Sequence, residues 1–303
     1  ADFNSELDFS FSSTDPDDDF GSDSETFDLK YTHYLGTVST NNKPYDEAAF
    51  LDRVSSFSVG GGLIQSDFAG LDADGFAGSF NYTHRNPKSP FVFSINTIST
   101  GIDGDEQIFT SSIDFEQDTS NIDITIGYYT SPTMLIRGGY SIQSMEQSAN
   151  QLDPGFFEAR FSLELDITTI SAGIKAISQM SQGQAHSFEF DFGVIDIEAD
   201  IREFEDDGVN VIDDRASFDG DGNAISLAYK YYMDNRTSIG FNLVNTSADV
   251  EGEDGDSTIF GFAFRTFSTD SLGIGFSLDK VNSDDGLDEE ATIIRINVIS
   301  RFN

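Results

Sequence analysis

Few side chains in this 303-residue sequence could carry out catalysis. Histidine occurs three times, as His33, His84 and His186, and cysteine is absent. A hydrolase needs a serine, a histidine and an acid that meet in space, and no motif marks such a group. The sequence also lacks metal-ligand spacings and phosphate-binding loops. We therefore expect no enzyme, no catalytic residue, no metal and no cofactor, and keep an enzyme that uses a histidine only as the weakest alternative.

The charged side chains indicate a different role. The chain has 54 acidic and 16 basic residues and a formal net charge of −38. This balance argues against nucleic acid as a partner, because phosphate binding needs a basic face. Several basic residues lie where apolar and polar residues alternate. In 291–302 the even positions are mainly apolar, while Arg295 and Arg301 occupy odd positions. A period of two residues predicts a β-strand with one apolar face.

Two architectures explain an apolar face opposite a charged one. A soluble sandwich would bury the apolar face against a second sheet. A membrane barrel would turn it to lipid and turn the charged face to an aqueous lumen. Phenylalanine (29) and glycine (27) are frequent, proline is rare (6), and no segment shows a helical period of useful length. The composition is therefore that of strands and turns.

Alternation predicts fourteen strands. Their approximate ranges are 2–12, 25–35, 53–65, 75–85, 90–99, 121–129, 133–146, 156–179, a strand from 184, 222–232, 236–248, 257–267, 271–282 and 291–302. The pattern slips at 166–169 and changes phase at 194–195, and both places suggest a β-bulge. The region 100–120 alternates weakly. If 106–116 and the slip at 166–169 are separate strands, the count becomes sixteen.

The connections fall into two kinds. Short, mildly polar turn regions lie near 36–52, 86–89, 130–132, 180–183, 233–235 and 268–270. The other connections are long and acidic, such as 203–221. This rhythm predicts one domain over 1–303, an all-β transmembrane antiparallel barrel with short periplasmic turns and long acidic extracellular loops. Both chain ends are then expected on the turn side. The barrel must close, because an open edge in lipid leaves backbone groups unpaired.

Tyrosines mark the strand ends beside the short turns. Amphipathic rings favour the boundary between hydrocarbon and water, so this clustering predicts an interface girdle. The girdle residues are Tyr31, Tyr82, Tyr128, Tyr129, Tyr229, Tyr231 and Tyr232. A soluble sandwich gives no reason for tyrosines and short turns to share one end.

The charged face of the strands predicts a polar lumen. The pore-lining candidates are Lys30, Arg137, Lys175, Lys230, Arg265, Arg295, Asp123, Glu189, Asp191 and Asp279. They could set the size and charge preference of a pore. They could equally form ion pairs that brace the wall. Both interpretations stay open at this point.

The acidic loops also have two interpretations. Clustered carboxylates at 15–19 and 219–223 could bind Ca²⁺, but neither completes a calcium-binding loop. Plain solvation of an acidic surface is the favoured interpretation.

The segment 43–59, K-P-Y-D-E-A-A-F-L-D-R-V-S-S-F-S-V, resembles a family of outer-membrane porins from gamma-proteobacteria. The end of the chain, R-F-N, is similar to barrel assembly signals, although Asn303 follows the aromatic residue. The resemblance implies a passive porin in the outer membrane of a Gram-negative bacterium.

We therefore expect a diffusion channel for small hydrophilic solutes or ions, mildly cation-preferring. Its expected surroundings are outer-membrane lipid and lipopolysaccharide, and a homo-oligomer is left open. The alternative is a non-conducting barrel that serves as a surface scaffold, adhesin or partner sheath, with a lumen plugged by 100–120 or 203–221.

Overall fold

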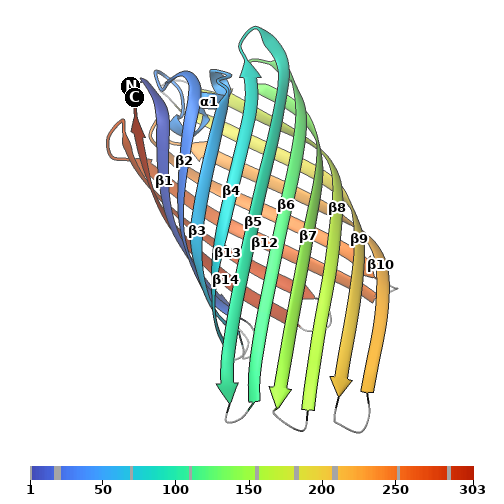
Figure 1. Cartoon of the computed structure of the whole chain (residues 1–303). Helices are drawn as coiled ribbons and strands as arrows, with labels where there is room; N and C mark the ends of the chain where they lie inside the picture. Colours follow the sequence, from blue (N-terminus) through green and yellow to red (C-terminus); the bar gives the residue numbers. More distant parts are fainter. Residues whose placement is uncertain are drawn as a thin grey trace.

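The chain forms a closed antiparallel β-barrel, in which each strand pairs with its neighbours in sequence and β1 pairs with β14 (Figure 1). The computed structural model describes residues 2–16, 22–68, 71–108, 111–153, 157–180, 184–206, 211–250, 253–284 and 288–303. Their strands are β1 Asp2–Pro16, β2 Ser22–Ser39, β3 Ser56–Phe68, β4 Leu71–Asn86, β5 Ser89–Ile108, β6 Ser111–Ser131, β7 Met134–Asp153, β8 Phe157–Gln179, β9 Ala185–Asp206, β10 Val211–Tyr232, β11 Thr237–Val250, β12 Glu253–Phe267, β13 Leu272–Asp284 and β14 Asp288–Phe302. The prediction of a closed barrel with fourteen strands is confirmed.

The two ends of the barrel differ. Both chain termini and the short helix α1, Ala48–Leu51, lie at one end, which we call the turn end (Figure 1). At the other, distal end, β5 to β10 project beyond the remaining strands. These six strands have 20 to 23 residues, against 13 to 18 in the others. Residues 211–219 of β10 pair with β9 but with none of the described residues of β11, whose pairing begins at Gly220.

The projecting wall corrects two predictions. The weakly alternating region 100–120, apart from 109–110, which lie outside the described residues, belongs to β5 and β6, which pair as far as Ile108 and Ser111. The predicted acidic loop 203–221 is mostly strand, since β9 extends to Asp206 and β10 begins at Val211. Residues 207–210 lie outside the described part of the chain. The strands were underestimated because their distal parts lack an apolar outer face.

Along β6 to β10 the outer face changes from apolar to acidic. On β6, Ile122, Ile124 and Ile126 are more than a third exposed on that face. Glu116 and Asp118 follow on the same face of the same strand, because its side chains alternate without a break there. The inner face changes in the opposite sense. On the lumen-facing side of β9, Glu189 and Asp191 are followed along the strand by Ile195 and Ile197. The inversion is what a strand needs when its outer face passes from hydrocarbon into water.

This inversion replaces the two predicted β-bulges. The pairing of β8 with β9 runs from Glu158 to Gln179 without a register shift, through both 166–169 and 194–195. Residues 157–179 therefore form one uninterrupted strand, and the sixteen-strand alternative is wrong. The change of phase in the sequence comes from a change of surroundings along a regular strand.

We call the exposed apolar part of the outer face, such as Ile122, Ile124 and Ile126 on β6, the apolar band. Its position gives a first testable prediction. Replacing Ile124 with lysine, in the middle of the band on β6, should destabilise the barrel by about 2–4 kcal/mol in lipid. Replacing Glu116 with lysine, on the same face of the same strand but beyond the band, should change stability by less than about 1 kcal/mol. Urea unfolding in phospholipid vesicles measures both. Equal losses for the two variants would place the band elsewhere.

The prediction of a tyrosine girdle is partly wrong. Tyr128 and Tyr229 are exposed on the outer face by 47% and 38%, and Tyr31, Tyr82 and Tyr231 share that face and are partly exposed. Their role at a membrane boundary stays a prediction. Tyr129 and Tyr232 are only 4% and 1% exposed and face the lumen. Neighbouring residues of a strand point to opposite faces, so only one tyrosine of each adjacent pair can face outward.

Candidate functional site: the plug and the lumen

The connection between β2 and β3 folds into the lumen at the turn end. We call residues 40–55 the plug. It contains a 3₁₀ turn, Tyr45–Glu47, followed directly by α1, Ala48–Leu51. Neither is long or apolar enough to cross a membrane, and the same holds for every described helix. Asn42 and Arg53, near the two ends of the plug, have left-handed φ angles of 56° and 52°. Such angles cost non-glycine residues about 1–3 kcal/mol, so the fold of the plug must be maintained by its contacts.

Three buried apolar clusters fasten the plug to the wall on different sides. Phe50 packs in a cluster formed with β5 to β10, Ala48 in a cluster with β1 and β2, and Tyr45 in a cluster with β12 and β14. The wall residues of these clusters are Val92, Tyr129, Leu135, Ile177, Ala185 and Tyr232; Phe3 and Val38; and Phe267 and Ile299. The wall elsewhere turns much of its apolar surface outward, so the plug is where this chain builds a hydrophobic interior.

Asp46 binds two cations of the wall. One of its oxygens lies 3.2 Å from Nη1 of Arg265, and the other lies 3.7 Å from Nζ of Lys230. Its side chain is only 7% exposed. Burial alone would raise the pKa of Asp46, but the positive charges of Arg265, Lys230 and Arg301 outweigh burial and hold that pKa below its ordinary value of 3.8. Asp46 is therefore a carboxylate at any physiological pH.

Glu47 is held as firmly. Its Oε2 lies 2.9 Å from Nζ of Lys175, and the hydroxyl of Tyr232 donates a hydrogen bond of 3.0 Å to its Oε1. Lys175 also lies 3.6 Å from Glu189, which in turn pairs with Arg137. Arg137 donates hydrogen bonds of 2.9 and 2.6 Å to the two oxygens of Asp191. The plug thus joins an ion-pair network that spans β7, β8 and β9.

The rim of the turn end adds further contacts. The hydroxyl of Tyr45 donates a hydrogen bond of 2.6 Å to Asp270, which also pairs with Arg236. The hydrogen bond from Tyr45 contributes most to lowering the pKa of the Asp270 carboxyl. Arg301 of β14 donates hydrogen bonds to Glu6 at 2.7 Å and to the Tyr45 carbonyl at 3.3 Å. Its guanidinium also lies over the rings of Phe3 and Phe267, at 4.5 and 4.3 Å.

Space remains between the plug and one side of the wall. A cavity of about 360 Å³ is lined by Asp46 of the plug and by the inner faces of β1 and β10 to β14. A smaller cavity of about 160 Å³ reaches Glu47 and Lys175. The two share Lys230, Gly240, Asn242 and Ala263, so they adjoin along the same wall. The lumen at the turn end is therefore narrowed by the plug, with polar space left along β10 to β14.

The structure brings eight of the ten predicted pore-lining residues into two groups. Arg137, Lys175, Glu189 and Asp191 form the network next to Glu47. Lys230, Arg265, Arg295 and Asp279 line the larger cavity. Asp123, which accepts a hydrogen bond of 3.0 Å from Asn96, and Lys30, which lies opposite Asp8, face the lumen outside these groups. Whether they act on a solute stays a prediction. No pattern in the sequence indicated that Asp46 and Glu47 would join them.

The plug also corrects the prediction for 36–52 and the predicted occupants of the lumen. Residues 36–52 are not a simple turn, and 100–120 and 203–221 form wall strands, apart from residues outside the described part of the chain. The signal that could have revealed the plug is A-A-F-L at 48–51, an apolar run inside an otherwise polar connector. Its aromatic and aliphatic side chains need burial, and the lumen provides it.

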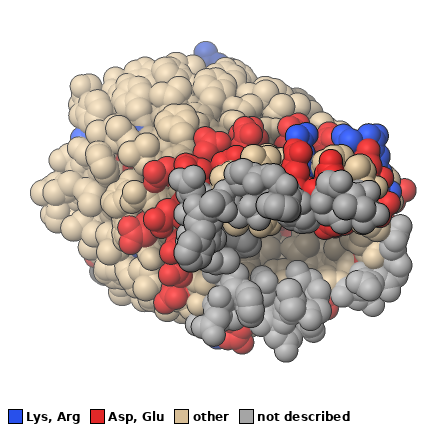
Figure 2. Space-filling view, turned by 60° about the horizontal axis from the view of Figure 1, so that its bottom comes forward, with Lys and Arg blue, Asp and Glu red and all other residues tan. Residues whose placement is uncertain are grey.

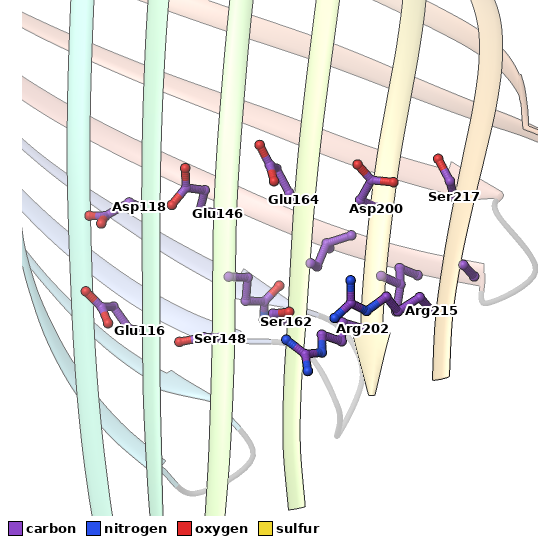
Figure 3. A pocket seen from close by; sticks show the side chains of 14 residues that line it. Glu116, Asp118, Glu146, Ser148, Ser162, Glu164, Asp200, Arg202, Arg215 and Ser217 are labelled. Carbon is purple, nitrogen blue, oxygen red and sulfur yellow. The ribbon is translucent and has the colours of Figure 1, made fainter. Parts of the chain in front are cut away.

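A second hollow lies on the outer face of the projecting wall. This groove of about 660 Å³ crosses β6 to β10, and its side chains form two rows (Figure 3). In one row Asp118, Glu146, Glu164 and Asp200 stand directly opposite one another on four neighbouring strands. The other row includes Arg202 and Arg215, and Arg202 pairs with Asp213. Figure 2 shows acidic side chains gathered on the surface towards the distal end.

The Ca²⁺ alternative gains no support at the residues that can be placed. Residues 219–223 lie within β10, so their side chains alternate between its two faces and do not converge. Residues 17–19 of the other predicted site lie outside the described residues. Among the described residues there is no group of three or more histidine, aspartate or glutamate side chains placed to hold a metal ion.

The pKa of Asp46 leads to a prediction for pH. A carboxylate whose pKa is lowered by folding stabilises the fold above its unfolded pKa and loses that effect as pH falls through the lower, folded value. The attachment of the plug should therefore be constant from pH 7 to about 4 and weaken only below. Any conductance through the barrel should therefore stay constant from pH 7 to about 4 and rise below that value, where the plug is held less firmly. Conductance recorded between pH 7 and 3 checks this. An Asp46→Asn variant should lack the acidic rise, and a rise at pH 5–6 in the native chain would contradict this assignment.

Comparison with known proteins supports the fold. No protein-family model and no curated protein matches the sequence, so the resemblance to a porin family stays an expectation. Among solved structures, outer membrane protein Omp33 of Acinetobacter baumannii is 17% identical over 99% of both chains, with a TM-score of 0.53. The CymD monoaromatic hydrocarbon channel is 11% identical over 99% of this chain and 89% of that chain, with a TM-score of 0.59. The toluene transporter TbuX of Ralstonia pickettii is 9% identical over 99% and 90%, with a TM-score of 0.55. At these identities the likeness concerns the fold, and the chain has the closed barrel fold of bacterial outer-membrane proteins.

Proposed function

We propose that this chain is an outer-membrane channel for small solutes, narrowed at its turn end by the plug. The observation that carries the proposal is the polar space beside the plug, where charged side chains of β10 and β12 to β14 face two adjoining cavities. Charged groups inside a barrel are tolerated where water or partners solvate them, and water along this wall gives a path for solutes. The channel and transporter names of two similar structures are compatible with this role.

Several finer features belong to the same proposal. The barrel lies in the outer membrane of a Gram-negative bacterium, with lipid and lipopolysaccharide around the apolar band and the acidic distal end outside the cell. The solutes are small and hydrophilic, and the net charge of −38 supports a mild preference for cations through the potential around the mouth. Self-association into a homo-oligomer is part of the proposal without a residue assigned to it. No catalytic role is proposed.

Planar-bilayer recording of the purified protein tests the channel. Discrete conductance steps are expected, and a reversal potential measured across a salt gradient gives the sign of the ion preference. Absence of any conductance, in the native chain and in variants with a weakened plug, would overturn the proposal.

The second candidate is a non-conducting barrel that presents a surface scaffold. The plug itself favours it, since three apolar clusters and several ion pairs seat residues 40–55 in the lumen. Under this alternative, variants that release the plug would open a path that the native chain never uses. Uptake of a small labelled sugar into vesicles that contain the native protein separates the two: uptake supports the channel, and its absence supports the scaffold.

A further inference from the structure

Two features adjoin on the inner wall of the barrel: one lies in the larger cavity beside the plug, and the other lies just beyond the lining of that cavity. On its floor, Arg295 of β14 lines the cavity together with Lys230 and Arg265. Arg295 is exposed to the lumen and forms no ion pair or hydrogen bond with any described residue, whereas the other two bind Asp46. Among the described residues, the cavity therefore contains one cation without an ion pair beside two that bind Asp46, and the carboxylates of Asp8 and Asp279 line it as well.

An apolar patch lies directly beyond this cation on the inner wall. Val244, Ile259, Val281 and Ala291 stand opposite one another in a row across β11 to β14. Ile293 lies next to that row, two residues from Arg295 on the same face of β14. These side chains are partly exposed to the lumen. Two residues of a strand span about 6–7 Å. A cation and an apolar surface are thus separated by the length of a small organic molecule.

The plug shows which anion this environment accepts. The plug places the carboxylates of Asp46 and Glu47 in the lumen, and both form ion pairs with cations of the wall. Asp46 pairs with Arg265 and Lys230, and Glu47 pairs with Lys175. Guanidinium groups match the geometry of a carboxylate, and charge-assisted hydrogen bonds are about twice as strong as neutral ones. A carboxylate supplied by a solute would meet the same chemistry at Arg295.

We propose that the wall at this cavity binds a small amphiphilic organic acid, with its carboxylate at Arg295 in the cavity and its apolar body beyond the cavity lining, against Ile293 and the row from Val244 to Ala291. The inference rests on the proposed channel function, because it names the class of solute that the channel selects. An aliphatic chain of about six carbons, or one aromatic ring, fits the spacing of the two features. The site excludes neither smaller acids nor neutral analogues, but it favours a molecule that has both parts.

Equilibrium binding to the protein in lipid nanodiscs tests the proposal without requiring conduction. The probe is hexanoate, and the comparison ligands are acetate, which lacks the apolar body, and hexanamide, which lacks the charge. Ligand partition into empty nanodiscs is subtracted. Hexanoate should bind at least tenfold more tightly than either comparison ligand. Similar affinities for hexanoate and hexanamide would overturn the proposal.

Two variants locate the site. Arg295→Gln should weaken hexanoate binding at least tenfold, while the matched control Arg202→Gln, on the outer face of β9, should leave it unchanged. Ile293→Thr keeps a β-branched residue in the strand and should reduce the preference for hexanoate over acetate at least threefold. Equal affinities for Arg295→Gln and Arg202→Gln would place any binding elsewhere. Hexanoate binding without conductance would reject the channel and keep this site; conductance without hexanoate binding would do the reverse.

Discussion

Replacing Asp46 with asparagine and Glu47 with glutamine together should raise single-channel conductance severalfold, or produce it where the native chain shows none. The two carboxylates are 7% and 5% exposed and bind three wall cations. Breaking a buried ion pair by removing one partner costs about 3–5 kcal/mol, because it leaves an uncompensated charge. Water in the lumen solvates part of that charge and reduces the loss. The remaining cost raises the free energy of the state in which the plug occupies the lumen. The state with a displaced plug therefore becomes more populated.

The matched control carries the same chemical changes on the outer surface. Glu198→Gln and Asp200→Asn on β9 remove two carboxylates that face away from the lumen. Their double variant should conduct like the native chain. If the plug variant conducts no more than this control, the apolar clusters alone hold the plug and the ionic contacts do not.

Replacing Arg301 with glutamine should lower the free energy of unfolding by about 3–5 kcal/mol. The Arg301 side chain is only 4% exposed, and it connects β14 to Glu6 of β1 and to the carbonyl of Tyr45 in the plug. The substitution leaves Glu6 without its cation, at the seam where the barrel closes. It also removes the stacking of the guanidinium on Phe3 and Phe267.

A double-mutant cycle with Glu6→Gln separates these effects. The two substitutions together should cost less than the sum of the single ones, by about 0.5–3 kcal/mol, because the second removes the charge that the first leaves unpaired. Urea unfolding in lipid vesicles supplies the four values. Additive losses would show that Arg301 acts through packing and the plug, and that the ion pair with Glu6 contributes nothing measurable.

The sequence was sufficient for the strands and their faces because alternation is a local property. In 291–302 the outward isoleucines and the inward Arg295 and Arg301 follow from parity alone, and the structure has them so. Parity could also have separated Tyr128 from Tyr129 and Tyr231 from Tyr232, since neighbours cannot share a face.

Two features could not be predicted in this way. The change of phase at 194–195 suggested a bulge because strand patterns assume that each face keeps one environment, whereas here the environment changes along the strand. The plug is invisible for another reason. A helix of four residues has no stability of its own. Its position depends on partners far away in sequence, such as Tyr232 for Glu47 and Arg265 for Asp46.

The polarity inversion also determines how deeply the barrel sits in the bilayer. The continuous apolar runs on the outer faces of β6 and β7 end at Ile122 and Ile142, which lie opposite each other, and those of β8 and β9 end at Ile170 and Val194, which also lie opposite each other. Between β7 and β8, and again between β9 and β10, the boundary steps by two residues, because Ile142 lies opposite Thr168 and Val194 opposite Asn223. A flat plane cutting tilted strands produces such steps. Sinking the barrel would drag the carboxylates of the projecting wall into hydrocarbon, and raising it would lift the isoleucines into water. One immersion depth is therefore favoured, and bilayers of other thickness have to thin or thicken around it.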